Sequence, residues 1–283
     1  MSSLFYQRTI AIATMHGKEK VIEPIISQAF DCVCIVPEWI DTDQFGTFTR
    51  DIKRRWDMLQ AARAKIHKAM EITWCDIAIA SEWSFGADPM IPFIQSNLEL
   101  TLLYDKKNNI EVRWHYRTND LTIKWTHVSS VEEALCFAEE QWFPEYGIIV
   151  RRRKEWKRGI YKDISTEQEL IKRVEWMLKR PFTSQIYVET DMRAHQNPAR
   201  MTAIEWSIKN LVENAQSLCP ECEMPWFIIK STQWHLLCGW CGQPTRIPSH
   251  EVKLCDACGY TQKIKITIYG DYADPGRCGY CNP

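Results

Sequence analysis

The sequence predicts an α/β domain over residues 1–217 and a tandem zinc-ribbon domain over residues 218–283. Strand-like and helix-like segments alternate through the first region, which favours a mixed central sheet with flanking helices. Four Cys-x-x-Cys pairs follow one another in the second region, at spacings typical of zinc ribbons. A chain of 283 residues is long enough for one sizeable domain and a small appended one.

The elements of the first region follow from hydrophobic periodicity. Apolar runs predict strands over residues 9–14, 32–36, 76–80, 99–104, 110–116 and 186–189. Apolar residues at helical spacing predict helices over residues 19–30, 51–73, 131–141, 166–179 and 198–214. In the last helix, Asn197 is the expected N-cap and Pro198 the first helical residue, because proline lacks an N–H group that the first turn leaves unbonded anyway.

Composition limits the classes of partner. With 45% hydrophobic and 25% charged residues, the chain has an ordinary globular composition. The formal net charge is −1, so a nucleic-acid surface would have to be a local patch. There is no apolar run of about 18 residues, so we expect no membrane span and a cytoplasmic protein. In a reducing compartment, paired cysteines bind metals more often than they form disulfides.

Four polar motifs, at residues 14–19, 41–47, 81–86 and 189–195, are each expected to form the turn just after a strand. In open α/β sheets the ligand binds at the carboxyl ends of the strands, and helix N-termini there attract anions. The candidate phosphate-binding residues are Thr14, His16, Lys18, Thr47, Ser81, Arg193, His195, Asn197 and Arg200. The carboxylates in the same motifs are Asp41, Asp43, Glu82, Glu189 and Asp191. Carboxylates beside cations suit a Mg²⁺-bound phosphate ester.

Each of these residues also has a structural interpretation when it is taken alone. Asp41 and Asp43 are common turn residues and helix caps. A single histidine such as His16 or His195 is more often half-buried and hydrogen-bonded, and Lys18 is also typical of a solvated helix start. Only the joint placement of the motifs favours a ligand site.

The cysteine pairs predict two structural Zn²⁺ ions. The expected ligands are Cys219, Cys222, Cys238, Cys241, Cys255, Cys258, Cys278 and Cys281. Fifteen residues separate the first pair from the second and nineteen separate the third from the fourth, as in zinc ribbons. Four cysteines close each site, so the ions are structural rather than catalytic. Sequential pairing is favoured because its loops are shorter, while a cross-braced arrangement of first with third also fits the spacing.

A basic run, RRRKEWKR at residues 151–158, is typical either of a solvated strand or loop or of a nucleic-acid contact. In the second case its cations would track a phosphate backbone while Trp156 stacks on a base.

Two family resemblances extend this interpretation. The motifs RTIAIATMHGKE, DTDQFGTFT, IAIASEWSFG and VETDMRAHQNPARM, with the four-pair cysteine tail, resemble a bacterial family classified as a domain of unknown function. The resemblance spans nearly the whole chain. Members of that family usually have glycine where Trp83 stands.

The chain also resembles the inosine/xanthosine triphosphate pyrophosphatases in the order of its motifs. The matching residues are Thr14, His16, Lys18, Asp43, Gly46, Thr47, Phe48, Ala62, Lys65 and Glu82. This resemblance implies that Lys18 and Lys65 hold phosphates, while Asp43 and Glu82 hold Mg²⁺ and position the attacking water. His16 replaces the asparagine of those enzymes, and Glu82 stands where two aspartates are common. The candidate catalytic residues are Asp43, Lys65, Glu82 and Asp191.

The leading hypothesis is therefore a Mg²⁺-dependent phosphohydrolase or pyrophosphatase that acts on a nucleotide or another phosphorylated small molecule. One alternative is a nucleic-acid-binding protein that uses the zinc ribbons and the basic run. Another is a protein-interaction module whose nucleotide pocket is filled by Trp83. The sequence leaves the oligomeric state open.

Overall fold

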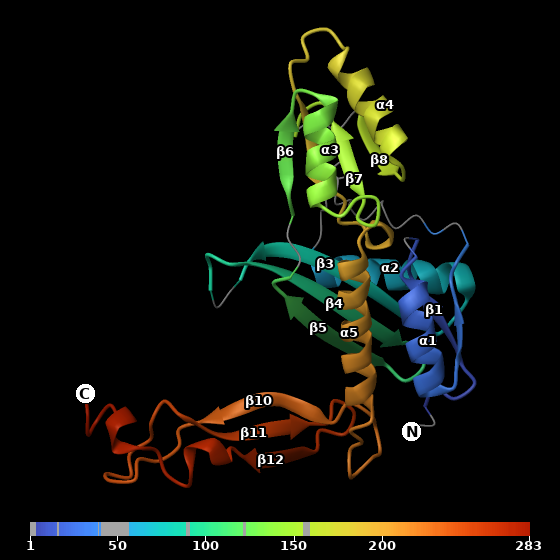
Figure 1. Ribbon diagram of the computed structural model, residues 1–283. Coiled ribbons are helices and arrows are strands. Elements are labelled where there is room, and N and C mark those ends of the chain that lie inside the picture. Colours follow the sequence, from blue (N-terminus) through green and yellow to red (C-terminus); the bar gives the residue numbers. More distant parts are fainter. Residues whose placement is uncertain are drawn as a thin grey trace. The chain divides into compact units, whose positions relative to one another are not determined.

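The computed structural model describes residues 4–15, 17–38, 40, 57–88, 91–120, 123–154 and 159–283. The chain divides into two compact units (Figure 1). The larger unit is Gln7–Leu211, and the smaller one combines Met1–Tyr6 with Val212–Pro283.

The first sheet of the larger unit has five strands in the order β2-β1-β3-β4-β5. Their bounds are β1 Thr9–Ile12, β2 Val33–Ile35, β3 Ile77–Ala87, β4 Gln95–Asp105 and β5 Ile110–Thr118. Strand β1 runs parallel to β2 and β3, whereas β4 and β5 form an antiparallel meander with β3. The expectation of an α/β fold with a mixed sheet is confirmed for this part of the chain.

Strand β3 is longer than the sequence pattern predicts. Residues 81–86 were expected to form a turn, but β3 pairs with β4 without interruption from Ile77↔Asp105 to Ala87↔Gln95. The backbone groups of the polar segment therefore find their hydrogen-bond partners on β4, and the predicted turn is wrong. Because side chains alternate along a strand, Ser81 and Glu82 point to opposite faces of the sheet.

Helices cover both faces of this sheet. Helix α2 (Met58–Thr73) packs small and branched side chains such as Ala62 and Ile66 against alanines of β1 and β3. On the opposite face, Ser207 of α5 (Pro198–Ala215) shares a 2.7 Å hydrogen bond with Thr101 of β4. Helix α1 (Glu19–Phe30) follows β1 and begins on this same face, where its first turn reaches β3.

A second sheet in the larger unit has four strands in the order β6-β9-β7-β8, and every neighbouring pair is antiparallel. The strands are β6 Trp125–Val128, β7 Ile148–Arg151, β8 Ile160–Ile164 and β9 Ile186–Thr190. Helices α3 (Val131–Glu140) and α4 (Glu167–Leu178) connect them, so the chain order is βαββαβ with two split βαβ units.

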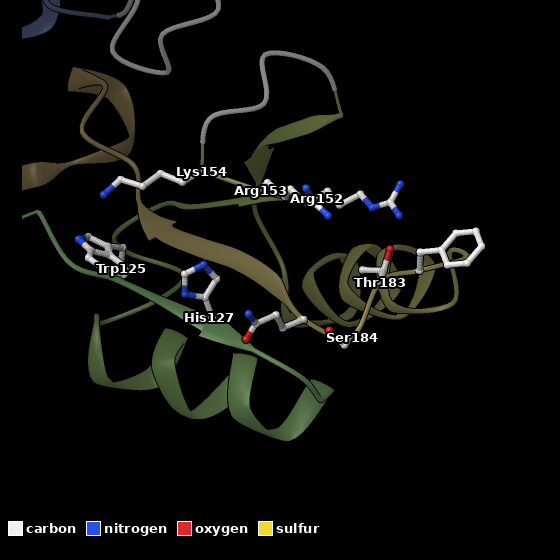
Figure 2. A pocket seen from close by; sticks show the side chains of 9 residues that line it. Trp125, His127, Arg152, Arg153, Lys154, Thr183 and Ser184 are labelled. Atoms are coloured by element: carbon white, nitrogen blue, oxygen red, sulfur yellow. The ribbon is translucent and has the colours of Figure 1, made fainter.

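Helices α3 and α4 pack on one face of this second sheet. Their apolar residues form a core with Val150 of β7 and Val188 of β9. Because side chains alternate, Trp125, His127 and Tyr187 lie on the other face, where their rings contact one another. Figure 2 shows Trp125 and His127 projecting from β6 on that side.

The smaller unit contains an antiparallel three-stranded sheet of β10 (Ile228–Trp234), β11 (Pro248–Leu254) and β12 (Thr261–Lys265). The Phe5 ring lies 5.8 Å from that of Trp226, which places the N-terminal segment in this unit. Among the described residues, no helix has the length and apolar character that crossing a membrane requires.

Candidate functional site

The predicted site residues fall into three groups. His16, Asp41, Asp43 and Thr47 lie outside the described residues. Thr14, Lys18, Lys65, Ser81 and Glu82 lie around the carboxyl end of β1 and the adjoining part of β3. Asp191, Arg193, His195, Asn197 and Arg200 follow β9 and lead into α5.

Lys18 connects the start of α1 to the two central strands. Its Nζ donates hydrogen bonds of 2.8 Å to the carbonyl oxygen of Ser81 and 2.9 Å to the Ser81 hydroxyl. The same atom lies 3.9 Å from an oxygen of Glu99, whose side chain is completely buried in β4. Burial disfavours the charged ammonium and lowers the pKa of Lys18 to about 8, although the attraction of Glu99 opposes the shift.

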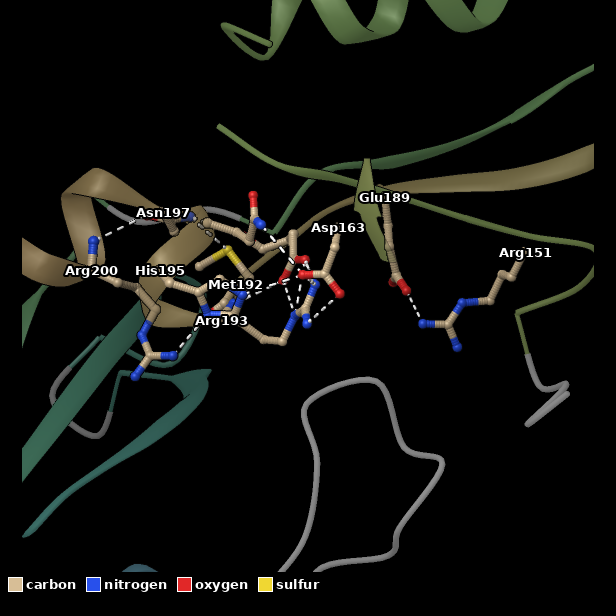
Figure 3. A network of polar contacts seen from close by, with 10 residues as sticks. Arg151, Asp163, Glu189, Met192, Arg193, His195, Asn197 and Arg200 are labelled. Carbon is tan, nitrogen blue, oxygen red and sulfur yellow. Dashed lines mark hydrogen bonds and ion pairs between the residues drawn. The ribbon is translucent and has the colours of Figure 1, made fainter. Parts of the chain in front are cut away.

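Arg200 approaches the same carboxylate from the first turn of α5. Its Nη2 lies 3.2 Å from Glu99 Oε2, and its Nη1 donates a 2.6 Å hydrogen bond to the carbonyl oxygen of Met192. The guanidinium carbon is 4.8 Å from the centre of the Trp83 ring. Asn197 accepts a 3.0 Å hydrogen bond from the Arg200 backbone N–H, as expected of a helix cap (Figure 3). Arg200 and Lys18 therefore share one buried counter-ion.

Glu99 was not among the predicted site residues. It lies in the run Leu98–Leu103, in which all residues apart from Glu99 and Thr101 are leucine. Burying a carboxylate in an apolar strand costs free energy unless the carboxylate is paired with a cation. A glutamate in a run of leucines therefore indicates a buried ion pair.

A second ion pair lies on the other face of the sheet. Lys65 of α2 contacts a carboxylate oxygen of Glu82, and both side chains are largely buried. The charge of Lys65 lowers the pKa of Lys18, and the charge of Glu82 raises it. Both effects are smaller than those of burial, Glu99 and Arg200. The sheet edge thus gathers three cations, Lys18, Lys65 and Arg200, and two carboxylates, a formal excess of one positive charge (3 − 2 = +1).

The residues after β9 form a separate polar network (Figure 3). Arg193 donates to Asp191 from both Nη2, at 2.5 Å, and Nε, at 3.0 Å. Its Nη2 is also 2.8 Å from Asp163, which His195 approaches to 3.3 Å. Partial burial raises the pKa of Asp163, but the hydrogen bond and charge of Arg193 outweigh this and lower it overall.

The network meets the start of α1 through His195. A Cβ atom built on Gly17 would lie 3.7 Å from His195 Cβ, so the segment after β9 contacts the residue before Lys18. The structure therefore brings together residues from three of the four predicted motifs, those at 14–19, 81–86 and 189–195. The fourth motif, at 41–47, lies outside the described residues.

The eight tail cysteines form two clusters, and in each cluster the four sulfur atoms lie within 4.8 Å of one another. Cross-pair Sγ–Sγ distances of 3.5–3.8 Å match the edge of a tetrahedron around an ion with Zn–S bonds of about 2.3 Å, which is about 3.8 Å. The first cysteine of each pair is buried. The donor set and its geometry are consistent with two zinc sites.

The favoured sequential pairing of the cysteines is wrong. Cys219 and Cys222 join Cys255 and Cys258, while the second pair, Cys238 and Cys241, joins the fourth. The sheet explains this arrangement. The start of β10, the end of β11 and the start of β12 lie together, since Ile228 pairs with Leu254 and Leu254 with Thr261. The first and third cysteine pairs adjoin this end, and the other two pairs adjoin the opposite end.

The knuckle turns share one backbone pattern. In each, the residue after the second cysteine donates its N–H to the carbonyl oxygen of the first, for example Gly242 to Cys238 at 3.0 Å. Gly242 and Gly259 take φ values of +68° and +76° there, a conformation that glycine adopts without strain. Hydrogen bonds from the backbone N–H groups of Cys241 and Trp240 lower the pKa of the Cys238 thiol to about 7, which favours the metal-binding thiolate.

Comparison with known protein families gives a match. Residues 65–283 match the family described as Domain of unknown function (DUF6671). No curated protein matches the chain. The match covers β3, the buried charge cluster except Lys18, the second sheet and both cysteine clusters. Since it spans well over half of the sequence, the chain belongs to the DUF6671 family.

Proposed function

We propose that this protein is a Mg²⁺-dependent phosphohydrolase or pyrophosphatase that acts on a nucleotide. The observation that supports it best is that two buried groups of charges lie beside the carboxyl end of β1. Lys18 and Arg200 share Glu99 on one face of the sheet, and Lys65 pairs with Glu82 on the other. This is the edge of an α/β sheet where anionic ligands bind, and the N-terminus of α1 adds its partial positive charge there.

The ion pairs suit an exchange of partners when the ligand arrives. In the described structure Lys65 is paired with Glu82, and Arg200 with Glu99. A phosphate chain would offer oxygen atoms to the lysines, while its Mg²⁺ would take up the carboxylate of Glu82 that Lys65 releases. Such an exchange keeps each buried charge opposite a counter-charge, which avoids the large cost of an unpaired ion.

The assigned roles follow from this geometry. Lys18 and Lys65 contact the phosphate groups, and Glu82 is the carboxylate toward the metal ion. Asp191 is held by Arg193, so we assign it to positioning the segment that carries His195 and Arg200. The two cysteine clusters bind zinc and stabilise the smaller unit, which is too small to be held by an apolar core alone.

The direct test is release of phosphate or pyrophosphate from a panel of nucleoside triphosphates, with and without Mg²⁺. We expect Glu82→Gln and Lys65→Met each to reduce turnover by about 100-fold, as losses of transition-state charge stabilisation do. Lys68→Met is the matched control, because Lys68 lies one turn away on α2 and is exposed in a pair with Glu71. Absence of turnover by the wild-type protein, or full turnover by Glu82→Gln, excludes the proposal.

A further inference from the structure

A cavity of about 340 Å³ opens beside the second sheet, away from the charge cluster described above. It is lined by β6, by the segment after β7 and by the turn before β9 (Figure 2). The lining residues are Trp125, His127, Arg152, Arg153, Lys154, Phe182, Thr183, Ser184 and Gln185. Among these described residues three are cationic and none is acidic, although the whole chain has a net charge of −1.

The described part of the basic run, residues 151–154, divides between the interior and this cavity, whereas residues 155–158, with Trp156, lie outside the described residues. Arg151 turns inward, where it is 3% exposed and paired with Glu189. The next three residues of the run line the cavity instead. Arg152 donates a 2.6 Å hydrogen bond to the carbonyl oxygen of Pro181, which holds its guanidinium beside the turn that carries Phe182. The cations are thus directed to one place rather than spread along a solvated loop.

Aromatic rings accompany the cations at both ends of the cavity. At one end, Lys154 Nζ lies 4.4 Å from the centre of the Trp125 ring, which in turn stacks on Tyr187 at 5.5 Å. At the other end, Phe182 is 98% exposed. A phenyl ring gains nothing for folding at that exposure, so its place beside Arg152 in a cation-lined cavity suggests a partner with a flat apolar face.

We propose that this cavity binds single-stranded nucleic acid. The phosphates contact Arg152, Arg153 and Lys154, and an unstacked base packs on Phe182. The hydroxyl groups of Thr183 and Ser184 and the amide of Gln185 lie in the same wall and offer hydrogen bonds to base edges. A duplex keeps its base faces covered and cannot use the exposed ring, so the chemistry favours single strands.

The test is fluorescence anisotropy with a labelled single-stranded oligonucleotide of about ten nucleotides, its duplex and a labelled mononucleotide. We expect the single strand to bind most tightly. Three phosphate contacts predict that log K falls with log salt concentration at a slope of about −2, since each contributes about −0.7. No binding, tighter binding of the duplex, or equal affinity for the mononucleotide would overturn the proposal.

Variants separate this surface from general charge effects. Arg153→Glu is expected to weaken binding about tenfold or more and to make the salt slope shallower by about 0.7. Lys172→Glu makes the same change of charge on the exposed side of α4, a helix that packs on the opposite face of the sheet. It should leave affinity nearly unchanged, and equal losses in the two variants contradict the assigned surface.

Phe182→Ala provides a variant that should fold normally, because the side chain is almost fully exposed. We expect about a tenfold loss of affinity for the single strand with an unchanged salt slope, as removal of one stacking ring predicts. Unchanged affinity would show that the ring does not take part and would overturn the proposed mode of binding.

Discussion

Arg200, in the first turn of α5, bonds to Glu99 in the middle of β4, although the two residues are 101 positions apart in the chain. The contact fixes the start of α5 on the face of the sheet that Lys18 also reaches. The position of the cations therefore depends on a carboxylate that is itself sealed from solvent.

Loss of that carboxylate charge should be costly. Glu99→Gln leaves two buried cations without their counter-ion, and we expect a loss of about 3–5 kcal/mol in the free energy of unfolding, measured by urea denaturation. Glu111→Gln is the matched control, because Glu111 lies on β5 of the same sheet but pairs with Arg63 of α2 in a half-exposed position, and its loss should cost less than about 1 kcal/mol. Similar losses in the two variants would contradict the assigned role of Glu99.

The lowered pKa of Lys18 predicts a pH dependence. An ordinary lysine in the unfolded chain keeps its proton up to pH 10.5, whereas folded Lys18 releases it near pH 8. The unfolded state then binds more protons between those values, so this group makes the folded state more stable as pH rises through that window. Lys18→Met should lack this contribution, and thermal unfolding of both proteins across the window measures it. Parallel pH profiles would show that the lysine is not perturbed.

The cysteine pairing can be read from metal stoichiometry. The observed clusters predict that the double variant Cys219→Ser, Cys255→Ser keeps one zinc ion per chain, because both cysteines belong to the same cluster. The double variant Cys219→Ser, Cys238→Ser should lose both ions, because it removes one ligand from each cluster. Sequential pairing predicts the reverse results, and elemental analysis of the purified variants distinguishes the two.

Gly147 should not tolerate a side chain. A Cβ there would lie 2.9 Å from Gln196 Cβ and 3.1 Å from Asp191 Cβ, too close for carbon atoms, so the segment after β9 would have to move. We expect Gly147→Ala to cost about 1–3 kcal/mol in thermal or urea unfolding, as overpacking does. Gly86→Ala is the control, since its added Cβ would meet nothing within 4 Å. An equal effect of both changes would exclude the steric explanation.

The parts of the fold that local chemistry determines were predictable. Helices α1, α3, α4 and α5 begin within a residue or two of their predicted positions. Residue types that cap helices, such as Ser130, Thr166 and Asn197, can be recognised in the sequence just before the helix starts. Strands β6, β7 and β8 were missed. Strands β6 and β8 mix polar and apolar residues, and the short apolar run of β7 leads directly into the basic run, so none of the three stands out as a strand.

The remaining features depend on contacts between distant segments. Residues 81–86 are polar enough to resemble a turn, and only pairing with β4 makes them strand. The charge cluster was anticipated for Lys18, Lys65, Glu82 and Arg200 but not for Glu99, which lies within a strand rather than in a segment that follows one. The cysteine pairing follows from the order of three strands, which overrides the small entropic preference for short loops.

The crossed arrangement of the cysteine pairs also sets when each metal site can form during synthesis. When synthesis has reached Cys241, the first two cysteine pairs are present, but they belong to different clusters. Neither four-cysteine site is complete until Cys258 has been synthesised, and the second must wait for Cys281. A chain that stops before the third pair therefore has no complete four-cysteine site to stabilise the smaller unit.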